Sequence, residues 1–248
     1  KGAPLTTKRD LATLEPKELL GLLTSDHRHE REQAMVLLVD GKRPPELDEA
    51  IRGWKNSAKD GRSRLAALWL SQGLDRPDLS LLEKVLVDED PKVRAAAVRV
   101  AGDWLQILGR EKAFKLIEAA VLDANPRVRV EALRVITKLG GAEPMDLAFR
   151  VLSQPMDRFS QYALGLNFRE HGKEWLDGVV SGKLPIGGRE AALEFALSNQ
   201  GKGKGSGGLA SLMPKPLPRD GSGPWLNLAL ETGDPVLLET FYLQVLDQ

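Results

Sequence analysis

Two stretches of the chain share one pattern, "DEDPKVRAAAVRV" at residues 88–100 and "DANPRVRVEALRV" at residues 123–135. Looser copies occur on both sides of them, roughly every 30–35 residues. One arginine aligns across the five copies, at Arg31, Arg64, Arg94, Arg129 and Arg158. Recurrence at such a period is typical of folds that stack small supersecondary units. The repeat therefore constrains the architecture more strongly than any other feature of the sequence.

The two clearest copies begin as a helix start and continue as an amphipathic helix. Asp90 and Asn125 are residue types that cap helix N-termini, and the proline after each stands where a missing N–H costs nothing. Apolar residues follow at helical spacing, for example Val93, Ala97 and Val100. Each copy is therefore predicted to start a helix that buries one face.

A second helix is predicted before each of these. The segment "LSLLEKVLVDE" begins with a capping-box pattern from Ser80 to Glu83, and "EKAFKLIEAAVL" places Phe114, Ile117 and Val121 on one side of a helix. A pair of short helices cannot bury its apolar faces alone, so successive pairs must stack. The sequence therefore predicts an all-α fold, a right-handed α-solenoid of helical hairpins.

The repeat pattern weakens after residue 182, where Gly and Pro become frequent. The final helix is expected to begin at a cap, Asp234, and it has Leu238 where the other copies have arginine. The expected segments are an N-terminal extension at 1–15, the solenoid at 16–182, a loop plus helix at 183–199, a Gly/Pro-rich loop or linker at 200–224 and a terminal helical pair at 225–248.

The period and the phrase "DEDPKVRAAAVRVAG" resemble HEAT repeats, of the armadillo-like helical class. A narrower resemblance rests on "EREQAMVLLVD", "SRLAALWLSQGL", "DPKVRAAAVRVA" and "QPMDRFSQYALGLNFREHGKEWLDGVVSGKL". In order and spacing these are similar to the HEAT-repeat region of large haem-binding, membrane-bound dehydrogenase-like proteins of planctomycetes and verrucomicrobia. The resemblance covers about residues 14–185.

In that family the HEAT region lies between an N-terminal β-propeller and a C-terminal cytochrome c domain, in exported proteins. The resemblance therefore implies a connecting or docking role, with the propeller or cytochrome domains, or a separate subunit, as protein partners. It also implies a periplasmic or otherwise exported location, although the residues themselves fit the cytoplasm equally well. A further alternative is a subunit or fragment of a redox enzyme complex. The chain has no cysteine, so haem attachment through Cys-x-x-Cys-His is impossible and no cofactor is expected.

The remaining motifs give little support to chemistry. The lone cluster "DHRHE" holds His27 and His29 two residues apart, which do not share a helical face, and His171 is distant, so no metal site is expected. "GKGKGSGG" at 201–208 lacks the spacing of a phosphate-binding loop and is predicted to be a linker. No nucleophile motif occurs, and no apolar run approaches the roughly 18 residues of a membrane span. We predict no catalytic, cofactor-binding or metal site, and hence a non-catalytic interaction or scaffold module.

Two further features carry alternatives. Residues 91–138 contain ten Lys or Arg and five Asp or Glu, whereas the 35 basic and 35 acidic residues of the chain cancel. Nucleic-acid binding through a basic concave face is therefore the alternative function. The five arginines are expected to form a structural ladder between repeats. Core or inter-repeat packing, rather than a ligand cage, is expected for the five tryptophans, which are Trp54, Trp69, Trp104, Trp175 and Trp225.

Overall fold

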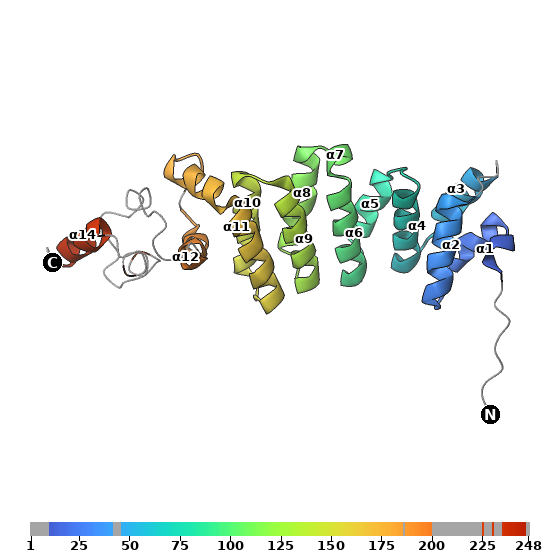
Figure 1. Ribbon diagram of the computed structural model, residues 1–248, viewed down its shortest axis with the longest axis horizontal. Coiled ribbons are helices and arrows are strands. Elements are labelled where there is room, and N and C mark those ends of the chain that lie inside the picture. Colours follow the sequence, from blue (N-terminus) through green and yellow to red (C-terminus); the bar gives the residue numbers. More distant parts are fainter. Residues whose placement is uncertain are drawn as a thin grey trace, which may run out of the picture. The chain divides into compact units, whose positions relative to one another are not determined.

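The computed structural model describes residues 10–41, 46–185, 187–199 and 235–246, together with Trp225 and Leu230. Within these residues every regular element is a helix and no strand occurs, so the predicted all-α class is confirmed. The chain divides into two compact units, Lys1–Gly109 and Arg110–Gln248, which we call unit 1 and unit 2. Figure 1 shows the helices of each unit as stacked pairs.

Unit 1 is built from stacked helical pairs. Its elements are η1 (Leu11–Thr13), α1 (Pro16–Leu22), α2 (Arg28–Asp40), α3 (Leu47–Ser57), α4 (Gly61–Gly73), α5 (Leu79–Leu86), α6 (Pro91–Asp103) and α7 (Leu105–Leu108). The second helices of the pairs form a row, because α2 packs on α4 and α4 packs on α6. Leu20, Leu38 and Leu70 come from α1, α2 and α4 and meet in one apolar cluster. Stacking of neighbours thus buries the faces that a single pair would expose.

Unit 2 repeats this arrangement. Its described elements are α8 (Arg110–Val121), α9 (Pro126–Leu139), α10 (Ala142–Phe149), η2 (Arg150–Ser153), α11 (Arg158–Val180), α12 (Glu190–Asn199) and α14 (Pro235–Leu246). Helix α9 packs on α8, α10 and α11, and α12 covers the end of the α10–α11 pair. An aromatic cluster fixes this end, because the ring of Phe149 lies 4.6 Å from that of Trp175 and 5.9 Å from that of Phe195.

Helix starts follow the local sequence. Asp90 Oδ1 accepts the N–H of Lys92 at 2.8 Å, and Asn125 Oδ1 accepts that of Arg127 at 3.0 Å, each directly before a proline. The capping box predicted at Ser80 is wrong. Helix α5 begins at Leu79, and the cap is Asp78, whose ionised carboxylate suits the positive helix end better than a hydroxyl does.

Several predictions concern other parts of the chain. Asp234, the loop at 200–224 and the phosphate-loop-like segment at 201–208 lie outside the described residues. Of the predicted terminal pair at 225–248, the structure describes α14, in which Leu238 is the fourth residue. The segment boundaries inferred from the sequence stay predictions.

Candidate interaction site

The repeated arginine occupies one helical position in four of its five copies. Arg31, Arg64, Arg94 and Arg129 are each the fourth residue of their helix. Three of them use one guanidinium nitrogen to bridge the carbonyl oxygens five and six residues earlier, at 2.7–3.0 Å. Arg64 donates to the carbonyl of Lys59 at 2.7 Å. The arginine therefore fastens the preceding loop onto the first turn of its own helix.

Arg64 and Arg129 also reach the neighbouring repeat. Arg64 donates to Oδ2 of Asp88 at 2.6 Å, and that carboxylate is only 5% exposed. Arg129 is itself 2% exposed and donates to the carbonyl of Pro155 at 2.6 Å. Charged donors in buried sites make strong hydrogen bonds when their geometry is good. The stabilising role of the arginine series stays a prediction, for which these contacts supply the geometry.

Arg158 occupies a different position from the other four. It is the first residue of α11, Asp157 caps the helix, and Gln161 stands at the fourth position. The guanidinium carbon of Arg158 lies 4.6 Å from the ring centroid of Phe159, which is a cation–π arrangement. The fifth copy of the sequence pattern is therefore offset by three residues from its helix, and Arg158 contacts Phe159 instead of the loop before the helix.

The histidines show no sign of joint chemistry. His27 and His29 are exposed at the start of α2, whereas His171 is half-buried in unit 2. Nε2 of His171 lies 3.1 Å from the carbonyl of Thr137, and Nδ1 accepts the N–H of Gly141 at 3.4 Å. Among the described residues, no group of three or more His, Asp or Glu side chains could hold a metal ion.

The tryptophans divide into buried and exposed positions. Trp175, Trp104 and Trp225 are buried, and Trp54 is partly buried against the first core cluster. Trp69 is 45% exposed on α4, so of the two expected roles core packing does not apply to this residue, and packing between repeats stays a prediction. It lies on the side of α4 opposite Leu68 and Leu70, which already fill the core.

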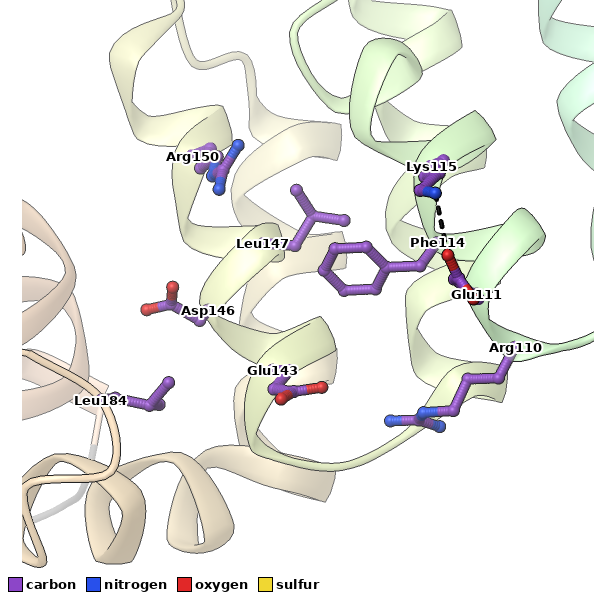
Figure 2. A pocket seen from close by; sticks show the side chains of 9 residues that line it. All are labelled: Arg110, Glu111, Phe114, Lys115, Glu143, Asp146, Leu147, Arg150 and Leu184. Atoms are coloured by element: carbon purple, nitrogen blue, oxygen red, sulfur yellow. Dashed lines mark hydrogen bonds and ion pairs between the residues drawn. The ribbon is translucent and has the colours of Figure 1, made fainter.

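A cavity of about 560 Å³ lies between α8 and α10 (Figure 2). Phe114 of α8 and Leu147 of α10 point toward each other across it and form an apolar floor. The other lining residues form a charged rim with one leucine, and they are Arg110, Glu111, Lys115, Glu143, Asp146, Arg150 and Leu184.

The cations of this rim already have partners. Lys115 pairs with Glu111 at 2.8 Å and Arg150 pairs with Glu118. Arg110 donates to the carbonyls of Leu139 and Gly140 at 2.8 and 3.0 Å, at the end of α9. The apolar floor of the cavity is therefore open to contact, while the cations of its rim are held by carboxylates and backbone carbonyls. This arrangement suits apolar binding better than acid–base chemistry.

Asp146 stands at the edge of this cavity and joins three elements. Arg189, from the loop before α12, binds it through Nε and Nη2 at 2.5 and 2.7 Å, and Trp175 of α11 donates Nε1–H at 3.0 Å. Burial raises the pKa of Asp146, but the hydrogen bonds from Arg189 and Trp175 and the charge of Arg189 outweigh it, so the pKa lies below 3.8. The pair is therefore ionised at neutral pH and holds the segment before α12 against α10.

In the first half of α11 three large apolar side chains are exposed, which we call the α11 stripe: Phe159, Tyr162 and Leu166. They are spaced by three and four residues and therefore lie on one face. Phe159 is 58% exposed and Tyr162 is 64% exposed, while Leu164 and Phe168 on the opposite side are buried. Sequence reasoning missed the stripe, although the spacing of the two aromatic residues was a visible signal.

The comparisons with known proteins agree with this architecture. Residues 79–158, from α5 to the start of α11, match the family described as HEAT repeats. No curated protein matches the chain. The fold and the match together define an all-α solenoid of HEAT-like helical pairs, as the resemblance predicted. Among the described helices, none is long and apolar enough to cross a membrane.

Proposed function

We propose that the chain is a non-catalytic protein-interaction module. HEAT repeats commonly act as interaction scaffolds, because a stacked core displays side chains along an extended surface. The observation that carries the proposal is the α11 stripe, in which two aromatic rings stay more than half exposed. Aromatic side chains are enriched at the energetic centres of protein interfaces.

Crosslinking in cells that carry the gene tests this function. The tagged full chain is expected to enrich one protein in roughly equimolar amount over an unrelated bait of similar size. Mass spectrometry of the crosslinks identifies the contacting residues. Enrichment of no protein above the unrelated bait would contradict the function.

A finer proposal follows the resemblance stated above. In it the module connects a β-propeller and a cytochrome c domain of an exported c-type-cytochrome-containing protein, or acts as a subunit of such a redox complex. Its support is the set of similar segments between residues 14 and 185. The coding sequence around this chain is the test. A propeller pattern upstream and Cys-x-x-Cys-His downstream are expected, and their absence would refute this context.

Nucleic-acid binding is the second candidate, and one observation favours it. Arg127, Arg134 and Lys138 are exposed along one side of α9, inside the basic segment 91–138. Counterion release would make such binding strongly dependent on salt. Retention on heparin at moderate ionic strength would support it, and elution without retention would eliminate it.

A further inference from the structure

Three arginines of unit 2 that have no acceptor among the described residues lie beside the α11 stripe. The arginines with a carboxylate or carbonyl acceptor are Arg110, Arg129, Arg134, Arg150 and Arg189. Within the described part of unit 2, the side chains of Arg127, Arg158 and Arg169 have no such acceptor. All three are exposed. Arg158 touches the ring of Phe159, and Arg169 continues the stripe three residues after Leu166.

Arg127 belongs to the same surface, because α9 and α11 run parallel with a fixed offset. Asn167 donates to the carbonyl of Leu133, and Nε2 of His171 contacts that of Thr137, so both contacts join residues 34 positions apart. An α-helix turns by about 100° per residue. With this register, the exposed side of α9, which carries Arg127, Arg134 and Lys138, and the α11 stripe lie on the same side of the helix pair. Figure 1 shows the two helices side by side. Arg127 therefore flanks the first turn of α11.

We propose that this α9–α11 face binds an acidic amphipathic helix of a partner protein. The inference rests on the proposed interaction function and names the partner's chemistry. Phe159 to Leu166 spans about two helical turns, which matches apolar side chains spaced three to four residues apart on a partner helix. The unpaired guanidinium groups on both sides match carboxylates flanking that apolar row.

The composition of the face favours a peptide over a nucleic acid. Leu166 has no aromatic surface on which a base could stack, and Arg134 is already paired with Glu131 at 3.1 Å. Three unpaired cations would neutralise few phosphates, whereas a helix would remove both aromatic rings from water.

A display library of helix-forming peptides, selected on the full chain, tests the proposal. Enriched peptides are expected to carry Leu or aromatic residues at three- and four-residue spacing, with Asp or Glu beside them. Fluorescence anisotropy then measures their affinity. Tyr162→Ala should weaken binding about 10- to 30-fold, as removal of a central aromatic residue does at other interfaces. Tyr242→Ala is the matched control, because Tyr242 of α14 is also 64% exposed, and it should change nothing.

Charge reversal provides the second arm. The double variant Arg127→Glu, Arg169→Glu should weaken the acidic peptides about 10-fold or more, and peptides with Lys in place of their Glu should recover much of the loss. Unchanged thermal unfolding verifies that the variants fold. Basic or non-helical consensus peptides, equal affinity for Tyr162→Ala, or no enrichment would each overturn the proposal. Tight binding of single-stranded DNA that Tyr162→Ala abolishes would overturn it in favour of a nucleic acid.

The crosslinking experiment separates this inference from the proposed function. If Tyr162→Ala captures the native partner as well as the unaltered chain does, the interaction function stands and the α9–α11 face is wrong. If the unaltered chain captures no partner, the interaction function itself fails.

Discussion

Replacing Arg129 by Ala should destabilise unit 2 by about 2–4 kcal/mol. The side chain is 2% exposed and donates to the carbonyls of Asp123, Ala124 and Pro155 at 2.8, 3.0 and 2.6 Å. Hydrogen bonds from a charged donor contribute about 1.5–3 kcal/mol each. Part of that sum is offset, because removing a buried guanidinium also removes its desolvation cost. Water can reach the partly exposed loops after truncation, which limits the loss further.

Urea and thermal unfolding, followed by far-UV circular dichroism, measure this effect. The expected loss corresponds to a fall in Tm of roughly 5–15 °C for a chain of this size. Arg127→Ala is the matched control, since Arg127 lies two residues away on the same helix with an exposed side chain that has no acceptor. It should change stability by less than about 0.5 kcal/mol. Amide exchange should localise the loss to α9 and α11.

The loss of stability in Arg129→Lys should lie between the losses in Arg127→Ala and Arg129→Ala. Lysine keeps the charge, but its single ammonium cannot reach the carbonyls of both loops as the guanidinium fork does. A loss for Arg129→Ala no larger than that for Arg127→Ala would refute the reasoning, because the inter-repeat bonds would then contribute nothing measurable.

Two further perturbations test other contacts. Gly61→Ala should destabilise unit 1, because the added Cβ would lie 2.5 Å from Oδ1 of Asp88. In Gly53→Ala the added Cβ would meet no atom within 4 Å, so this variant should stabilise α3 by up to about 1 kcal/mol. Thermal unfolding compares them, and a Gly61→Ala protein as stable as Gly53→Ala would contradict this packing. The second perturbation is a change of pH. Hydrogen bonds from Arg189 lower the pKa of Asp146, although burial acts in the opposite direction. The ionised Asp146 therefore stabilises the folded chain above the pKa that this carboxyl has in the unfolded chain, and this stabilisation is lost as the pH falls through its pKa in the folded chain. The difference in urea midpoint between the unaltered chain and Asp146→Asn should therefore be constant above about pH 5 and shrink below about pH 4, and a difference independent of pH would contradict it.

The helix starts could be predicted because their causes are local. Asp90 and Asn125 bind backbone N–H groups two residues away, so the contact is encoded within one turn. The error at Ser80 has a local cause as well, because Asp78 offers a competing cap two residues earlier. The offset of Arg158 was hidden because the pattern around it resembles the other copies, while the actual start of α11 follows Asp157.

The contacts that build the candidate site are not local. Arg189 and Asp146 are 43 residues apart, and Arg129 and the carbonyl of Pro155 are 26 apart. No pattern within one repeat indicates which acceptor such a side chain will meet. Trp69 illustrates the same limit, since its exposure depends on which side of α4 the neighbouring helices cover.

The sequence by itself determined the helices, their pairing and the repeated arginine, because caps, prolines and apolar spacing act within a few residues. Only the tertiary structure decided which charges are paired and which apolar side chains stay exposed. The α11 stripe shows the difference. The spacing of the stripe can be read from the sequence. The packing of α9 on α11, however, sets that Phe159, Tyr162 and Leu166 are exposed beside Arg127. Burial and pairing are properties of neighbours in space, and stacking sets those neighbours across some thirty residues of chain.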